Sequence, residues 1–265
     1  MFGTVLTFDI ETVPDVAAGR RLYGLNGLGD EDVAKAMFHK RREENGSEFL
    51  RHPLQRVVAI SVLLRHRDEI KIWSLGEIDS DEAVIIRRFF DGIERFSPTL
   101  VSWNGSGFDL PVLHYRSLLH GVPAPRYWDT GDGSKEFRWN NYVNRYHSRH
   151  TDLMDVLSGY QARACAPLHD ISVLLGLPGK LDMDGGDVWG RYCAGRLAEI
   201  RDYCETDVVN TYLVYTRYEL IRGNLTEKEW AEEQALVRRT IGQDAKAHPH
   251  WQRFLDAWPE KGSGV

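Results

Sequence analysis

The sequence predicts an α/β fold in which a mixed β-sheet is flanked by helices. Three β-like runs follow one another early in the chain, at residues 4–10 (TVLTFDI), 56–64 (RVVAISVLL) and 69–75 (EIKIWSL). Further along, shorter β-like runs alternate with amphipathic stretches. Strands joined by short turns pair antiparallel, whereas strands separated by helices pair in parallel. The chain therefore predicts a three-strand antiparallel meander that is extended by parallel strands.

In the first part of the chain, the four residues RHRD (65–68) suit a hairpin loop between the second and third runs. The polar segment from about residue 15 to residue 55 is too long for a simple connection and predicts a helical insertion. Within it, the stretch DEDVAKAMFHKRREE (30–44) has helical character, with Asp30 as its expected N-cap.

In the second part, residues 80–96 predict an amphipathic helix with Ser80 as its cap. The later expected elements are a strand at 99–103, a turn at 104–107 (NGSG), a helix at 108–121, a strand at 150–157, helices at 168–177 and 196–221, and two helices beyond residue 223. We expect residues 1–222 to form the main domain and residues 223–265 to form a C-terminal helical extension.

Bulk properties narrow the class of protein. The net charge of −6 argues against a protein that coats nucleic acid with its whole surface, although it allows a local basic groove. The three cysteines, Cys165, Cys193 and Cys204, lack C-x-x-C spacing and suit free thiols in a reducing compartment. We find no apolar run of about 18 residues and no secretory signal, so we expect a cytoplasmic protein without a membrane partner.

The stretch FDIET (8–12) places two carboxylates inside a predicted strand. Because successive side chains of a strand alternate between faces, Asp9 and Glu11 share one face while Phe8 and Ile10 take the other. Two like charges on a half-buried surface repel each other and lose hydration, so a positive partner is expected, and a divalent metal ion suits. The alternative is a strand whose outer face meets solvent.

Two later stretches carry further acids. In WNGSGFDLPVL (103–113), Asp109 follows a strand and begins a helix, where either the helix dipole or a functional site at the strand end explains a carboxylate. In YCETD (203–207), Tyr203 and Asp207 are one helical turn apart and share a face, whereas Glu205 is expected to point to solvent. Each pattern alone also occurs by chance in structural positions.

Taken together and in this order, the three stretches resemble the motifs of the DEDD 3′–5′ exonucleases, in the tyrosine subgroup. FDIET is similar to the first motif, NGSGFD to the second and YCETD to the third. The resemblance is closest to bacterial proteins related to the exonuclease domain of family B DNA polymerases, and it runs from about residue 1 to residue 220. The histidine subgroup would require a histidine at position 202, which is Asp202 here. The resemblance implies a ribonuclease H-like fold.

The resemblance also implies a two-metal site for Mg²⁺ or Mn²⁺. Asp9 would bridge both ions, Glu11 and Asp207 would complete the ion that activates water, and Asp109 would hold the second ion. Tyr203 would orient the attacking water. Two ions about 3.5–4 Å apart can stabilise both the attacking and the leaving oxygen of a phosphodiester. The expected product is a nucleoside 5′-monophosphate, released from the 3′ end of single-stranded DNA or RNA, with DNA favoured.

Five further positions are candidates for contact with the substrate. The resemblance places Asn104 and Phe108 near the terminal nucleotide, where Phe108 would stack on a base unless it packs in the core. Thr12 and Val13 follow the first motif, and their backbone groups are candidates for contact with the terminal sugar. Lys180, in GLPGKLDMDGG, is either a phosphate ligand or an ordinary surface lysine.

Two basic-aromatic stretches, FHKRR (38–42) and FRWNNYVNRYHSRH (137–150), suit either a groove for single strands or solvated loops. Three histidines, His114, His120 and His169, are expected to be structural. Two other functions stay open. One is a nucleic-acid-binding or adaptor module without useful catalysis. The other is an exoribonuclease that trims RNA, since the motifs do not fix contacts to a 2′-hydroxyl.

Overall fold

The computed structural model describes residues 3–181 and 183–259, and these are built around one five-stranded sheet with the strand order β3-β2-β1-β4-β5. The strands are β1 (Val5–Pro14), β2 (Gln55–His66), β3 (Glu69–Ser74), β4 (Thr99–Ser102) and β5 (His150–Asp152). β1, β2 and β3 pair antiparallel, whereas β4 and β5 lie parallel to β1. This arrangement confirms the predicted α/β class and its mixed sheet, in which an antiparallel meander is extended by parallel strands.

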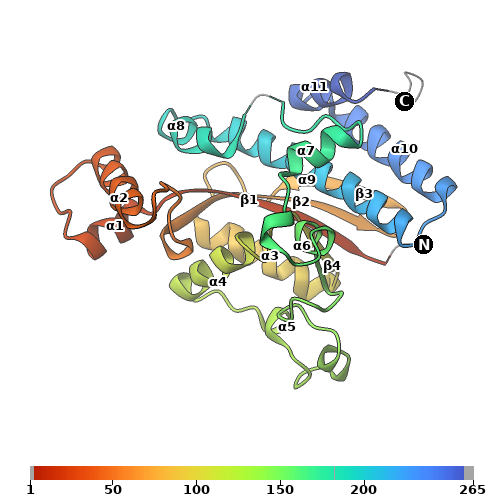
Figure 1. Cartoon of the computed structure of the whole chain (residues 1–265), viewed down its shortest axis with the longest axis horizontal. Coiled ribbons are helices and arrows are strands. Elements are labelled where there is room, and N and C mark those ends of the chain that lie inside the picture. The colour runs from red at the N-terminus through yellow and green to blue at the C-terminus, as the bar shows by residue number, and fades with distance from the viewer. Residues whose placement is uncertain (1–2, 182, 260–265) are drawn as a thin grey trace.

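Helices cover both faces of the sheet (Figure 1). One face packs against α3 (Glu82–Phe96), α4 (Asp109–His120) and α5 (Pro125–Trp128), and Phe8 and Ile10 of β1 join this core. The opposite face packs against α9 (Leu197–Ile221), together with α7 (Leu168–Leu174), α10 (Glu227–Asp244) and α11 (Pro249–Ala257). β1 therefore runs through the middle of the molecule, so its side chains of both faces are enclosed.

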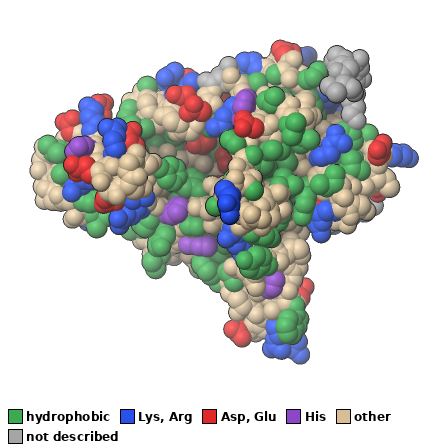
Figure 2. Space-filling view, in the orientation of Figure 1, with side chains coloured by type: hydrophobic (Ala, Val, Ile, Leu, Met, Phe, Trp, Pro, Cys, Tyr) green, Lys and Arg blue, Asp and Glu red, His purple; other side chains and the backbone are tan. Residues whose placement is uncertain are grey.

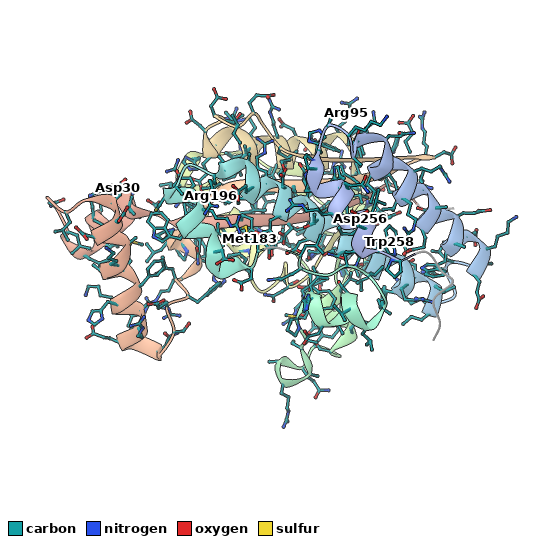
Figure 3. The ribbon with its side chains drawn as sticks, turned by 90° about the horizontal axis from the view of Figure 1, so that it is seen from above. Asp30, Arg95, Met183, Arg196, Asp256 and Trp258 are labelled. Carbon is teal, nitrogen blue, oxygen red and sulfur yellow. The ribbon has the colours of Figure 1, made fainter. Side chains whose placement is uncertain are left out.

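The segment predicted as a helical insertion contains α1 (Val16–Tyr23), α2 (Asp30–Asn45) and a 3₁₀ turn at His52–Leu54. It has a small hydrophobic core of its own, built from Val33, Met37, Leu50 and Leu54. Figures 1 and 3 show this lobe standing out at one end of the molecule. We refer to residues 15–54 as the N-terminal lobe.

Two predicted helix caps are wrong. Asp30 is the first residue of α2, and Gly29 occupies the cap position. Ser80 does not cap α3, because its hydroxyl accepts a hydrogen bond from the backbone N–H of Glu77 within a turn, and Asp81 takes the cap position.

The predicted strand at 150–157 is also wrong in its second half. β5 ends at Asp152, and α6 (Leu153–Leu157) begins directly after it. The carboxylate of Asp152 accepts hydrogen bonds from the N–H groups of Met154 and Asp155, which makes it the N-cap of that helix. The apolar residues after Asp152 suit a strand and a buried helix equally, so the cap decides between them.

The helices α1, α5, α6 and α8 (Val188–Cys193) were not predicted from the sequence. Nor were the short 3₁₀ turns at His52–Leu54, Lys135–Arg138, Ala162–Ala164 and Gly185–Asp187. α10 starts with a capping box between Thr226 and Glu229, and α10 and α11 pack on the same core as α9. The predicted division at residue 222 stays a prediction. Within residues 3–181 and 183–259, no helix combines the length and the apolar character that crossing a bilayer requires.

Candidate active site

Three elements bring the five predicted catalytic residues together. Asp9 and Glu11 lie in β1, Asp109 begins α4, and Tyr203 and Asp207 lie one turn apart in α9. Their proximity is visible in their electrostatics, since the charges of Asp109 and Asp207 act on both Asp9 and Glu11. Residues about a hundred positions apart in the sequence thus share one site.

In β1, the predicted alternation places the two acids of the first motif on one face. Phe8 and Ile10 enter the core beneath α3 and α4, while Asp9 and Glu11 face α9. The register of β1 against β2 shifts between Glu11 and Thr12. The pairing is therefore irregular at the end of the first motif, three residues before the N-terminal lobe begins.

A short loop between β4 and α4 presents the second motif. Asn104 adopts a left-handed conformation with φ of 63°, and its N–H donates to the Asp152 carboxylate at 2.9 Å. The N–H of Ser106 donates to the other oxygen of Asp152 at 2.8 Å. These two bonds fix the loop, so that Asp109 begins α4 with its side chain almost fully buried.

The third motif lies on the face of α9 that is turned to the sheet. Asp207 is buried, and its Oδ1 has no hydrogen-bond partner among the described residues. Tyr203 is buried one turn earlier. Contrary to the prediction, Glu205 does not point to solvent, because its Oε1 accepts a 2.7 Å hydrogen bond from Ser74.

The four carboxyl groups of this cluster are costly to charge, and the pKa of each is raised. Burial and the neighbouring carboxylates raise the pKa of Asp9 and of Glu11 well above their ordinary values. Burial raises the pKa of Asp109 to about 7, assisted by the charge of Asp152. Burial also raises the pKa of Asp207 to about 6, against the lowering effects of Tyr203 and Lys180. A cation bound among these groups would remove the cost of charging them.

The donor set fits hard divalent cations. The four acids Asp9, Glu11, Asp109 and Asp207 offer carboxylate oxygens, which Mg²⁺ and Mn²⁺ prefer. The buried Oδ1 of Asp207 lacks a protein partner among the described residues, and a metal ligand needs such a free lone pair. These residues therefore fit the Mg²⁺ or Mn²⁺ ions that the sequence predicts.

Sequence reasoning missed Cys204 as a neighbour of this site. Its thiol is buried, with Sγ 3.4 Å from the backbone oxygen of Asp9 and 3.5 Å from Asp9 Oδ2. The ligand atoms of Asp9, Glu11 and Cys204 lie within 4.8 Å of one another. The sequence feature that could have indicated this proximity is the position of Cys204 within YCETD, one residue after Tyr203.

His169 was also missed as part of the surroundings of the site. Its Nδ1 accepts a 3.1 Å hydrogen bond from the N–H of Lys180, and its ring lowers the pKa of Asp207. The other two histidines have structural partners, as predicted: His114 bonds to Tyr127, and His120 pairs with Glu82.

The predicted substrate residues lie around the carboxylates. The Thr12 hydroxyl donates to Gln55 at 2.9 Å, and Val13 is buried in a small cluster that includes Tyr203. Lys180 places its ammonium 5.7 Å from the centre of the Tyr203 ring and lowers the pKa of Glu11. Lys180 is thus a cation at the site and not an isolated surface lysine.

Phe108 takes an intermediate position between the two predicted roles. It packs on the core beneath α4 and remains partly exposed. Its ring also contacts Phe49 and His52, with centroid distances of 5.3 and 5.9 Å. The N-terminal lobe therefore supplies aromatic neighbours to the second motif. Asn104 is the first residue of that motif.

The two basic-aromatic stretches are largely engaged within the protein. In the first, Arg41 pairs with Glu44 and Arg42 with Glu48. In the second, the Tyr142 hydroxyl is buried against the backbone of Pro98, and most arginines pair with acids: Arg145 with Asp155 and Arg149 with Glu136. Figure 2 shows basic and acidic side chains interspersed over the lobe at the left. These contacts favour solvated surface segments over a dedicated groove.

The sequence of this chain matches a known protein family. Residues 47–258 match the family model described as a predicted 3′–5′ exonuclease related to the exonuclease domain of PolB. This range includes Asp109, Tyr203 and Asp207. Asp9 and Glu11 precede it, and the structure places them beside the other three.

Two curated relatives are similar over part of the chain, both catalytic subunits A of DNA polymerase epsilon. The protein from Saccharomyces cerevisiae is 42% identical over 45 residues, which cover 17% of this chain and 2% of that protein. The protein from Emericella nidulans is 26% identical over 145 residues, which cover 53% of this chain and 6% of that protein. The chain thus corresponds to a small fraction of these relatives.

Among solved structures, the zinc-bound form of the E. coli ExoI–ssDNA complex is similar at 12% identity with a TM-score of 0.34, covering 84% of this chain and 45% of that one. This likeness is too low to bear on what the present chain binds. The family match covers most of the chain and includes Asp109, Tyr203 and Asp207, three of the five predicted catalytic residues. The chain therefore belongs to the family of predicted 3′–5′ exonucleases related to the exonuclease domain of PolB.

Proposed function

We propose that this protein is a divalent-metal-dependent exonuclease that releases nucleoside 5′-monophosphates from the 3′ end of single-stranded nucleic acid, with DNA as the favoured substrate. The observation that carries the proposal is the convergence of Asp9, Glu11, Asp109 and Asp207 with Tyr203. Four carboxylates lie close together here, and the ammonium of Lys180 offsets only part of their charge. Such a cluster is costly to the fold, and a cation-dependent reaction explains its presence.

The acids would hold two ions, Mg²⁺ or Mn²⁺. Asp9 would serve both ions, Glu11 and Asp207 would serve one of them, and Asp109 would serve the other. When bound, such ions supply a nucleophile from water and neutralise charge that develops on the phosphodiester. Asp207 is well placed for this role because its Oδ1 is buried and available.

Tyr203 would orient the attacking water by a hydrogen bond and would not act as a base. Burial and the charges of Asp207, Glu11 and Asp9 raise the pKa of Tyr203 far above its ordinary value. A phenol in this state keeps its proton at every physiological pH, so it can donate a hydrogen bond but cannot accept the proton of water.

The residues around the acids would bind the terminal nucleotide. Lys180 offers a positive charge to a phosphate, and Phe108 offers an aromatic face to a base. Asn104 and the backbone of Thr12 and Val13 complete this set.

A cleavage assay tests the proposal. Short single-stranded DNA and RNA of the same sequence, each labelled at the 5′ end, are incubated with Mg²⁺, Mn²⁺ or EDTA. We expect a ladder that shortens from the 3′ end with either metal and stops in EDTA, and faster cleavage of DNA than of RNA. Faster cleavage of RNA would move the assignment to an exoribonuclease. Binding of either strand without cleavage would support the adaptor module instead.

A further inference from the structure

The C-terminal helix α11 places a histidine directly behind the third motif. His250 is 3% exposed, and α11 packs against α9. Figure 3 labels Asp256 on α11 and Trp258 directly after its end. Its Nδ1 lies 3.2 Å from Asp202, and its Nε2 lies 3.3 Å from Glu205. One imidazole ring thus contacts two carboxylates of α9, one with each nitrogen.

The two carboxylates that His250 contacts flank Tyr203 and Cys204 in the sequence of α9. Asp202 immediately precedes Tyr203, and Glu205 follows Cys204. Burial opposes a charge on the ring, but the two facing carboxylates outweigh it and raise the pKa of His250 above its ordinary value. Because one ring contacts two side chains of α9, it ties the segment of α9 that carries Tyr203 to α11.

A chain of polar contacts continues from His250 to β2, the strand that pairs with the first motif. Glu205 accepts a 2.7 Å hydrogen bond from Ser74 in β3, and Ser74 bonds to Ser61 in β2 at 2.9 Å. Ser61 lies opposite Asp9 in the β1–β2 register. The path therefore connects α11, α9, β3 and β2, and it ends at the residue that pairs with Asp9 in the sheet.

From this geometry we infer that His250 is a positioning residue of the exonuclease site, which acts by holding α9 so that Tyr203 faces the carboxylates. The inference rests on the proposed function. It gives α11 a part in the site, although α11 begins about forty residues after the third motif in sequence.

The test is a double-mutant cycle between His250→Gln and Tyr203→Phe, with kcat and KM measured on single-stranded DNA in Mg²⁺. We expect His250→Gln to lower kcat by roughly tenfold with little change in KM, because a small misplacement of a catalytic group slows chemistry more than binding. In the Tyr203→Phe background, the same substitution should change kcat by less than about twofold, since the group being positioned is already absent.

The matched control is His248→Gln, which changes an exposed histidine two residues earlier and should leave kcat and stability as in the wild type. Circular dichroism gives the folded fraction of each variant. Should His250→Gln fold poorly, Glu205→Gln replaces it in the cycle, because that substitution keeps the shape of the side chain and removes one charge.

The outcomes separate this inference from the proposed function. Suppose that the wild type and His248→Gln cleave DNA, and that the reductions in kcat caused by His250→Gln and Tyr203→Phe multiply in the double mutant. His250 then does not act through Tyr203, and the inference is wrong. An unchanged kcat in His250→Gln, or a loss equal to the loss of folded protein, overturns it as well. If the wild type does not cleave at all, the proposed function fails, and this inference fails with it.

Discussion

The backbone N–H of Ile10 in β1 donates a hydrogen bond to the carboxylate of Asp109 at the start of α4, with 3.2 Å between N and Oδ1. β4 pairs with β1 only from Val5 to Thr7, so strand pairing with β4 has ended before Ile10. The acid of the second motif fills that place and is thereby held beside the first motif. One hydrogen bond thus serves the sheet and the proposed metal site together.

Asp9→Ala is expected to abolish cleavage and to lower the affinity for Mn²⁺ by at least tenfold. The substitution removes the acid that is surrounded by the other three, so the metal-free protein should become more stable as their repulsion falls. Isothermal titration with Mn²⁺ and calorimetric melting in EDTA measure both effects. Asp79→Ala, at an exposed acid, serves as control. Cleavage that survives in Asp9→Ala would sink the site assignment.

Tyr203→Phe is expected to lower kcat by roughly tenfold or more while the affinity for Mn²⁺ stays within about twofold. The phenyl ring keeps its packing with Val13 and Met183, and the lost hydroxyl is the group that we propose orients water. Single-turnover kinetics provide the rate. Tyr192→Phe changes a tyrosine at the edge of the same cluster and should keep the wild-type rate. Equal rates for both variants would remove Tyr203 from the mechanism.

The stabilisation of the protein by Mg²⁺ is expected to grow as the pH rises from about 5 to about 8. Folding raises the pKa of Asp109 to about 7 and of Asp207 to about 6. An acid whose pKa is higher in the folded state than in the unfolded state is harder to charge when the protein is folded. Charging these acids therefore lowers the stability of the metal-free protein as the pH rises from about 4 through about 7. Mg²⁺ binds the charged carboxylates and thereby offsets this loss of stability.

The measurement is the difference in melting temperature between Mg²⁺ and EDTA at each pH. The pKa of His114 and of His150 is lowered to about 4 by burial, which has the opposite effect on stability, but these histidines contribute equally with and without the ion. A difference that is constant with pH, or larger at about pH 5, would contradict carboxylate ligation. Asp109→Asn should reduce the dependence on pH.

Gly105→Ala is expected to destabilise the protein by about 1–3 kcal/mol and to reduce cleavage. A Cβ at this position would lie 2.6 Å from the Cβ of Ser102, whose hydroxyl is fixed by a 2.7 Å hydrogen bond to the buried His150. The loop before Asp109 must therefore shift. Urea denaturation measures the change.

The control for this substitution is Gly92→Ala in α3, where an added Cβ meets nothing within 4 Å. Alanine is the better helix former, so this variant should gain up to about 1 kcal/mol and keep full activity. Destabilisation of similar size in both variants would show that the effect at Gly105 is not specific to the loop.

Much of the candidate site is predictable from local patterns. Strand periodicity alone places Asp9 and Glu11 on the face opposite Phe8 and Ile10, and the helical repeat places Tyr203 and Asp207 together. These periods follow from backbone geometry, and a buried face leaves little freedom in register. The order of the motifs then indicates the family, which the match over residues 47–258 confirms.

The sequence alone could not determine the contacts between distant segments. Glu205 reads as a solvent-facing residue within its own helix, yet it is enclosed because β3 and α11 bring Ser74 and His250 to it. Cys204 is an ordinary free thiol until β1 passes within hydrogen-bonding distance. Such contacts depend on which surfaces pack together, and local periodicity carries no information about that choice. The sequence by itself therefore determined the acids, their faces and the family, whereas tertiary packing decided which other side chains surround and hold them.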